Sequence, residues 1–574
     1  MVFILISLVV WLPAIIGLGS PLLVIRRNMI PRSDSLHLIF VALIGLATLG
    51  TIANLLNLFF PINPTVALII FFSGWLLFIL NARHFVKAVS LSLIIFGAIL
   101  AIYIAYSSRR SVAHYDSGLY HLQAIRWITE SKTPLGLANL HARLGFNSLW
   151  FSIAAALEIP PLQDKSSFVL NPMLLFIYGL AIGVGALNFR HSKNIALSEV
   201  FLLLTGLVWL IFTKGPFVSS PNTDFPVMIL TLLLTFTSIK TLESREGWVY
   251  YSFVAIFMAI LAITIKLSAI PLLLMPIMTL SWNLYRYRGQ WDDYKSALIT
   301  FLRTLLGTAS LLLVPWIMRG ILTSGCVAFP ISFGCFPSLD WAVPISSATN
   351  SAVRIKSWAR QPRVNPEVVL ADWNWLISWS DRFIASEVVI KTASLLFFGL
   401  VLLWIAAGEK KVSFKDQETY ILPALTLVLG IMFWFFTAPT IRFGEGYFWS
   451  LGLLIFSSGI YMNYVAYQAM RFNRILLIAC VIIILTYAKG LKFINRQELY
   501  TRRQEILLSW PAIPTAEVEE RFTKDGVRIL SPTSGDQCWN ASLPCTPYFN
   551  ANLKVTLGET GLPEGFQMVT LVDR

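Results

Sequence analysis

The residues best suited to do chemistry begin in a polar run at His114. The residues of this run whose side chains could take part in binding or catalysis are His114, Tyr115, Asp116, Tyr120, His121 and Gln123. Asp116 stands between an apolar stretch and a helix-like stretch at 118–130. A carboxylate in that place can accept a proton from a hydroxyl of a bound acceptor. It can equally cap the helix that follows. The pattern therefore leaves two roles for Asp116, a general base and a helix cap.

The polar run continues through Asn139, His141 and Arg143, and the same segment is rich in cations. The cations are Arg109, Arg110, Arg126, Lys132 and Arg143. An excess of positive charge there suits an anionic lipid or a pyrophosphate, and ordinary solvated charge is the alternative. For the three histidines of this segment, the simpler interpretation is hydrogen bonding within a folded loop.

Four more charged residues stand near the ends of apolar segments: Asp224, Lys266, Arg319 and Arg442. Charge in a membrane core is costly, so we expect these residues and the His114 run to form one site. Each also has a plainer role. Asp224 can cap a helix or hold an acceptor or metal, and Lys266 can snorkel or contact a phosphate. Arg442 can pair with Glu445, three residues on, or clamp a phosphate.

The elements that position these residues are predicted from composition. Of 574 residues, 56% are hydrophobic and only 13% charged, against about a quarter charged in soluble domains. Lipid must cover the apolar surplus, so we expect an all-α polytopic membrane protein with about fourteen spans. The expected spans are 3–24, 37–60, 65–82, 87–106, 166–188, 195–213, 224–242, 248–264, 267–283, 296–318, 390–407, 419–437, 446–468 and 474–490.

The distribution of basic residues predicts the orientation. Lys and Arg gather in every second short loop, so loops such as 25–36 and 284–295 are expected in the cytoplasm and both termini outside. The long loops 107–165 and 319–389 then face the exterior or periplasm. Because the net charge of +14 is scattered among these loops, it does not indicate nucleic acid as a partner.

The chain is expected to divide into a membrane domain at 1–490 and a small extracytoplasmic tail at 491–574. Within the first long loop, stretches 118–130 and 146–158 are predicted to be helices lying at the membrane interface.

The five cysteines include two close pairs in polar segments, Cys326 with Cys335 and Cys538 with Cys545. Close pairs in outer loops predict disulfides and an oxidising compartment, with free thiols as the alternative. Cys480 lies in an apolar span. No Cys/His metal spacing and no glycine-rich phosphate loop occurs, so no cofactor is specified, although a divalent metal fits the acidic residues.

The order of these features resembles the C-type (GT-C) superfamily of polytopic glycosyltransferases, over about residues 87–450. An acidic residue opens the first outer loop, an aspartate precedes a later span, and a Lys-Leu-Ser corner follows at Lys266. Two further segments are similar to stretches of bacterial members: Pro315-Trp316-Ile317-Met318-Arg319 with Thr323-Ser324-Gly325 and Phe329-Pro330, and Ala438-Pro439 with Arg442-Phe443. The likeness is greatest to uncharacterised bacterial membrane proteins. Asp116-Ser117 replaces the usual pair of acids, and three extra spans precede the first span of the family.

The resemblance implies an inverting glycosyltransferase of the bacterial inner membrane. Such an enzyme moves a sugar from a polyprenyl-phosphate donor, within membrane lipid, to a glycan or lipid acceptor on the extracytoplasmic face. Asp116 would be the general base, and Lys266 and Arg442 would bind phosphate. The expected substrate-binding residues are His114, Tyr115, Tyr120, His121, Gln123, Asn139, His141, Arg143, Asp224, Lys266, Arg319, Arg442 and Glu445. Two other functions stay open, an O-antigen polymerase or ligase and a lipid or solute transporter.

Overall fold

The computed structural model describes residues 1–21, 36–87, 89–191, 195–213, 215, 217–407, 414–467, 510–511 and 513–568. Ten helical segments within these ranges are long and apolar enough to cross a membrane, so the chain is a helical multi-pass membrane protein. They are α1 (Val2–Gly19), α3 (His37–Asn57), α10 (Ser167–His191), α12 (Asp224–Glu243), α13 (Trp248–Ile265), η4 with α14 (Leu267–Leu273 and Leu274–Arg286), η5 with α15 (Arg288–Gln290 and Trp291–Ser324), α19 (Glu387–Ala407), α20 (Phe414–Thr437) and α21 (Ile441–Tyr467).

Three shorter apolar helices fall where further spans are predicted. They are α4 (Pro64–Leu80), α6 (Leu91–Ser107) and α11 (Leu197–Phe212), and the short α5 (Ala82–Lys87) follows α4. The Asn63 side chain caps α4, and the Ser90 side chain caps α6 by accepting from Leu93 N at 3.2 Å. Each predicted span up to 446–468 thus coincides with a helix. The one at 474–490, with Cys480, lies outside the described residues.

Burial separates the inner helices from the outer ones. About 89% of the apolar windows of α10, α12 and α13 is buried within the chain, against 22% for α15 and α19. Exposed apolar side chains on α15 and α19 include Leu306 and Trp404. In a membrane these side chains are covered by lipid, so α10, α12 and α13 form the centre of the bundle.

The first long loop is itself helical. It contains η2 (Ser117–His121), α7 (Leu122–Glu130), α8 (Leu137–Leu140), η3 (Ala142–Phe146) and α9 (Leu149–Ala156). Helices are therefore present in both predicted stretches. The interfacial placement of the second is wrong, because every residue of α9 is buried and α9 packs against α3. A short helix that is apolar on all sides belongs in the core.

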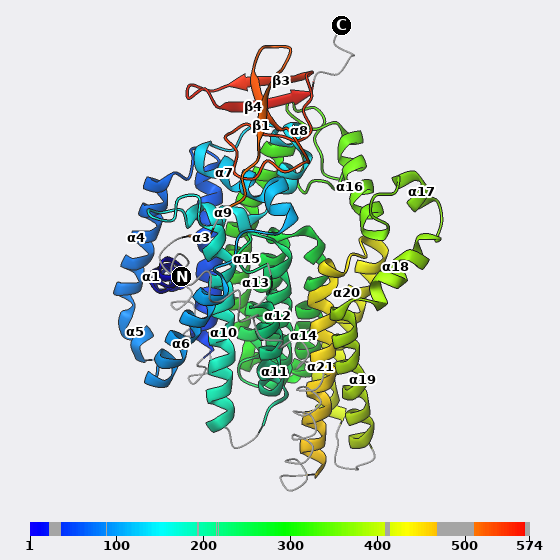
Figure 1. Cartoon of the computed structure of the whole chain (residues 1–574). Helices are drawn as coiled ribbons and strands as arrows, with labels where there is room; N and C mark the ends of the chain where they lie inside the picture. The colour runs from blue at the N-terminus through cyan, green and yellow to red at the C-terminus, as the bar shows by residue number, and fades with distance from the viewer. Residues whose placement is uncertain are drawn as a thin grey trace, which may run out of the picture.

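The second long loop begins later than predicted, because α15 continues to Ser324 and ends at Gly325 in a left-handed conformation. The Cys326–Cys335 disulfide follows directly. Three helices come next: α16 (Ile345–Arg360), α17 (Pro366–Ala371) and α18 (Trp375–Ile384). In Figure 1, α18 lies beside the upper end of α20.

The tail contains strands, so the expectation of an all-α chain needs correction. Strands β1 (Val518–Phe522) and β2 (Arg528–Pro532) form one antiparallel hairpin, and β3 (Leu553–Leu557) and β4 (Pro563–Met568) form another. The predicted Cys538–Cys545 disulfide forms between the two hairpins. Figure 1 shows the tail above α7 and α8, at one end of the helical bundle.

Candidate active site

Asp116 stands at the start of η2, where its side chain makes no capping hydrogen bond. Its two carboxylate oxygens instead meet two arginines. Arg143 Nη1 lies 3.2 Å from Oδ1, and Arg442 Nη1 lies 2.8 Å from Oδ2. Asp116 is also buried. The capping role is therefore wrong for this carboxylate, which serves as the shared partner of two guanidinium groups.

Arg442 has the largest effect on the protonation state of Asp116. Burial alone would raise the pKa of this carboxyl, because the charged form loses its water. The opposing charge of Arg442 contributes most to holding the pKa well below its usual range, and His121, His114 and Arg143 contribute less. Asp116 is consequently ionised at any physiological pH.

A second carboxylate, Asp224, completes the cluster from the first turn of α12. Lys266, in the corner between α13 and η4, donates to Asp224 Oδ1, and Arg442 Nε lies 3.8 Å from Oδ2. The side chain of the neighbouring Asn222 accepts from Phe225 N at 2.9 Å and so satisfies a free N–H group at the N-terminal end of α12. Asp224 is therefore not needed as a cap, and Arg442 bridges the two aspartates.

Phe443 lies beneath both cations of this cluster. Lys266 Nζ is 3.6 Å from the ring centroid, and Arg442 Cζ is 5.0 Å from it. The ring face attracts cations and helps to hold them where water is scarce. Among the described residues, the ion pairs of Arg442 go to aspartates, not to Glu445. Of the alternatives open to these cations, an Arg442–Glu445 ion pair is not found among the described residues, and Lys266 pairs with Asp224.

A small pocket opens beside the cluster, between α12, η4 and α21. Its lining residues are Asp224, Val227, Met228, Thr231, Lys266, Ser268, Arg442, Phe443, Gly446 and Tyr447. Three cations, Arg143, Lys266 and Arg442, face two carboxylates, Asp116 and Asp224. These ion pairs contain one more cation than carboxylates, which suits an anionic ligand. Over the described ranges, no three His, Cys, Asp or Glu side chains gather as metal ligands.

Two histidines flank Asp116. His114 Nε2 lies 3.4 Å from Arg442 Nη1, and its ring stacks against that of His121 at 5.8 Å. His121 Nδ1 in turn lies 3.5 Å from Ser117 Oγ. Burial lowers the pKa of both imidazoles, so both are neutral at pH 7. They line the site as uncharged polar groups.

Comparison with known proteins identifies the family of the chain. Residues 1–449 match the model of a family described as Domain of unknown function (DUF8201). The chain belongs to the DUF8201 family. No curated protein and no solved structure matches it. Asp116, Asp224, Lys266 and Arg442 all fall inside the DUF8201 region, and the tail lies beyond it.

Several predicted site residues of the DUF8201 region hold loops together instead of joining the cluster. Arg319 Nη1 lies 3.2 Å from Asn147 Oδ1 in a buried contact. Asn139 Nδ2 donates to Trp341 O and Phe566 O, at 2.9 and 3.1 Å. These two hydrogen bonds connect the first long loop to the second long loop and to the tail.

Two other predicted residues, His141 and Tyr120, also make aromatic contacts outside the ion pairs. His141 is buried edge-on against Tyr548, and burial lowers its pKa to about 3. The Tyr120 ring packs edge-on against Phe146 and lies 5.9 Å from Arg143 Cζ.

The tail closes over the segment that carries Asp116. Gln537 Nε2 donates to Tyr115 O at 2.8 Å, and Trp539 N donates to Gly118 O at 2.9 Å. Gln123 Nε2 donates to Trp539 O at 3.1 Å and to Ala541 O at 2.8 Å. The tail thus forms hydrogen bonds with the chain on both sides of Asp116. Sequence analysis missed this, since nothing in a local pattern pairs residues so far apart.

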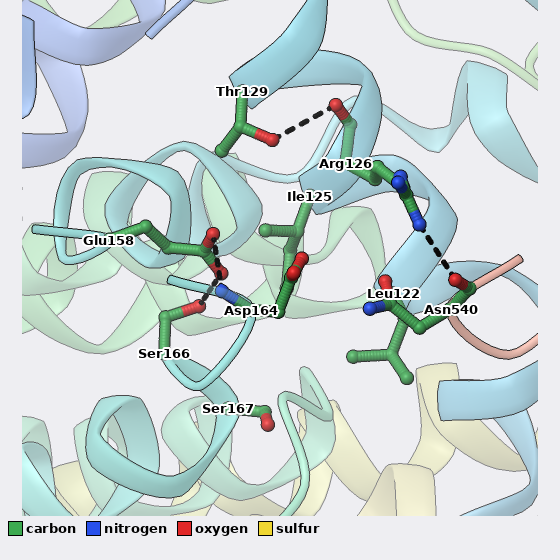
Figure 2. Close-up of a pocket in the computed structure, with 9 residues that line it drawn as sticks. All are labelled: Leu122, Ile125, Arg126, Thr129, Glu158, Asp164, Ser166, Ser167 and Asn540. Carbon is green, nitrogen blue, oxygen red and sulfur yellow. Dashed lines mark hydrogen bonds between the residues drawn. The ribbon is translucent and has the colours of Figure 1, made fainter. Parts of the chain in front are cut away.

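A second pocket lies between α7, the segment after α9 and the tail (Figure 2). Glu158 Oε1 accepts from Ser166 Oγ at 2.7 Å, and Oε2 accepts from Asp164 N at 3.1 Å. Burial raises the pKa of Glu158 to about 7, against these two hydrogen bonds. Arg126 Nη1 donates to Asn540 O at 2.7 Å across the same pocket. Sequence analysis did not single out Glu158.

Proposed function

We propose that the protein is a glycosyltransferase that moves a sugar from a polyprenyl-phosphate donor to an acceptor on the extracytoplasmic face of the inner membrane. The observation that carries this proposal is the bridge from Asp116 through Arg442 to Asp224 and Lys266 at one end of the bundle. It unites an ionised carboxylate with cations suited to a phosphate leaving group.

The donor phosphate belongs on the Lys266 side of the bridge. Lys266 and Arg442 line one pocket, together with the apolar side chains of Val227, Met228 and Phe443. A guanidinium fork and an ammonium match the oxygens of a phosphate, and apolar walls suit the lipid part of the donor. Negative charge that develops on the departing phosphate would be stabilised by these two cations.

Asp116 supplies the base. In the proposed reaction, the acceptor oxygen attacks the anomeric carbon while the bond from that carbon to the phosphate oxygen breaks. The bonding electrons leave with the phosphate, and the hydroxyl proton passes to the Asp116 carboxylate. Direct displacement of this kind inverts the anomeric centre. A phosphate that draws Arg442 toward itself also makes the carboxylate more basic, because less opposing charge remains beside it.

The orientation proposed from the basic loops has independent support. The disulfides Cys326–Cys335 and Cys538–Cys545 lie in the second loop and in the tail. The tail donates hydrogen bonds to Tyr115 O and Gly118 O, on either side of Asp116. Disulfides persist in oxidising compartments, so their position favours the periplasm or exterior for the side that carries Asp116.

The decisive experiment replaces Asp116 with asparagine. Asparagine is isosteric but not basic, so transfer of labelled sugar from polyprenyl-phosphate donors should fall by about a hundredfold or more. Asp525→Asn, at an exposed turn of the tail, is the matched control and should keep full activity. Normal transfer by Asp116→Asn would refute the assignment of the base and make Asp224 the next candidate.

An O-antigen polymerase or ligase is a second candidate, because Arg143, Arg442 and His114 surround the same carboxylate. A mechanism that depends on arginine and histidine should survive Asp116→Asn and fail with Arg442→Gln. Loss of transfer in both variants favours the glycosyltransferase with an aspartate base.

A further inference from the structure

Two exposed tyrosines flank one carboxylate at the mouth of the site. Tyr115 and Tyr548 are 55% and 53% exposed, although both belong to well-packed segments. Tyr115 Oη donates to Asp536 Oδ1, and the charge of the same carboxylate also acts on the Tyr548 phenol. Asp536 holds the Tyr115 phenol, and the His141 ring packs against that of Tyr548, so two partly held rings stay open to solvent.

This group of residues adjoins the candidate base on the side away from the cationic pocket. The charge of Arg143 acts on both Tyr115 and Tyr548, and Arg143 Nη1 contacts Asp116 Oδ1 at 3.2 Å. The other oxygen, Oδ2, faces Arg442 and so the pocket proposed for the donor. Asp116 therefore stands between two different environments, one cationic and partly apolar, the other aromatic and polar.

The chemistry of the second environment is suited to a carbohydrate. Aromatic rings offer flat apolar surfaces to the C–H faces of a sugar ring, and exposed aromatic groups mark ligand-binding surfaces. The carboxylate of Asp536 accepts hydrogen bonds from sugar hydroxyls, and Arg143 donates them. The hydrogen bond to Asp536 raises the pKa of Tyr115 to about 12, so its phenol stays protonated and neutral.

We propose that Tyr115, Tyr548 and Asp536, with Arg143 beside Asp116, form a subsite that binds the acceptor as a glycan. This inference rests on the proposed function and deepens it by naming the acceptor class. Tyr548 and Asp536 belong to the tail, outside the DUF8201 region, whereas Asp116 and Arg143 belong within it. The tail thus supplies acceptor recognition to a site whose charged residues come from the family region.

Binding of sugars to the full-length protein in nanodiscs tests the subsite without any donor. The probes are chitotetraose, maltotetraose and mannotetraose, each titrated and followed by saturation-transfer NMR. At least one should bind, with the strongest transfer to ring protons. Tyr548→Ala should weaken that binding by about tenfold or more, because the ring surface is lost. Tyr548→Phe keeps the ring and should weaken it by only about threefold, the value of one hydrogen bond.

Two controls separate recognition from folding. Tyr285→Ala removes a similarly exposed tyrosine from the end of α14 and should not change binding. Because the Tyr548 ring also packs against His141 at 5.2 Å, Tyr115→Ala provides a second variant that removes the other ring. It should weaken binding about as much, while the melting temperature and the Cys538–Cys545 disulfide stay intact.

The outcomes distinguish the subsite from the reaction. If no tetrasaccharide binds, or if both alanine variants bind as the wild type does, the subsite is refuted. Unchanged sugar transfer to a peptide or lipid acceptor by Tyr548→Ala would also refute it, and would leave the glycosyltransferase standing. If Asp116→Asn retains full transfer while Tyr548→Ala abolishes glycan binding, the subsite stands and the proposed base falls.

Discussion

Arg442 Nη1 lies 2.8 Å from Asp116 Oδ2, although 326 residues separate the two in the sequence. The contact joins α21 to the first long loop, and the same guanidinium reaches Asp224 on α12. The Arg442 side chain therefore connects three segments that are distant along the chain. A forked cation is required for this geometry, because an ammonium is a single point of charge.

Arg442→Lys should retain charge but lose the double contact. We expect sugar transfer to fall by about tenfold or more, while Arg442→Ala also lowers the free energy of unfolding by about 1–3 kcal/mol. The lower part of that range allows for the partial exposure of the pair. Transfer assays and thermal melts measure both effects, with Arg288→Ala, an exposed arginine, as control. Wild-type behaviour of Arg442→Lys would show that the fork is dispensable.

Glu158 should make the protein less stable as the pH rises. Its folded pKa of about 7 lies above the value of 4.5 for a free side chain, so the folded state binds the extra proton. The stabilisation is complete below about pH 4.5 and is lost as the pH rises to about 7, at a cost of about 3 kcal/mol. Asp116 does not contribute in this window, because its folded pKa is depressed and its stabilisation is lost only in stronger acid.

Thermal melts at pH 5 and pH 8 test this expectation. Relative to Glu158→Gln, wild type should lose stability between pH 5 and pH 8. The comparison with the variant is needed because the lowered pKa values of His114, His121 and His141 act in the opposite direction over this range. Asp525→Asn changes an exposed acid of the tail and should keep the wild-type difference. An equal pH dependence in Glu158→Gln would assign the effect to other groups.

Gly118→Ala should loosen the tail. A Cβ at Gly118 would lie 2.6 Å from the Trp539 ring, so one of the two segments must shift. Overpacking of this kind costs about 1–3 kcal/mol. If the clash is the cause, Trp539→Leu should relieve part of it in the double variant, and a double-mutant cycle of unfolding free energies measures the coupling. Strictly additive effects would show that the two residues act independently.

Loss of the Cys538–Cys545 disulfide should destabilise the tail. The bridge closes a short loop, so its removal should cost at most about 2–3 kcal/mol. We expect a shift in mobility or mass upon reduction of wild type, and none from this bridge in Cys538→Ser. Thiol titration of protein taken directly from membranes checks the native state. Two free thiols in that sample would contradict the bridge.

Labelling of introduced cysteines tests the orientation. Gly289 has no atom within 4 Å of an added Cβ, so Gly289→Cys presents an open thiol. In a Cys480→Ser background, a membrane-impermeant maleimide on intact cells should label Asp525→Cys in the tail and spare Gly289→Cys. The reverse pattern would place the tail and the site in the cytoplasm.

The sequence predicts the spans well, because a membrane helix is a local property of about twenty residues. The sequence also predicts that one end of the bundle holds Asp116, Asp224, Lys266 and Arg442, since charge avoids the membrane core. The ion-pair partners of these residues, in contrast, do not follow from the sequence. Glu445 is the nearest acid to Arg442 along the chain, yet tertiary packing supplies two aspartates from other elements.

Other features escaped sequence analysis for the same reason. Glu158 has no unusual neighbours in the sequence, and its raised pKa comes from burial that only the folded chain creates. The strands of the tail are short, and two-residue-period patterns of five residues carry little information. The α9 segment was placed at the interface by its length, whereas its apolar faces place it in the core.

The contacts between the tail and the first loop can form only after a delay during synthesis. Gln123 and Trp539 are 416 residues apart. At about 5–20 residues per second, a ribosome needs about 20 to 80 s to make the second after the first. For that interval the first loop must stay in the membrane without its covering partner, so the tail can cover the segment around Asp116 only after the helical bundle has been synthesised.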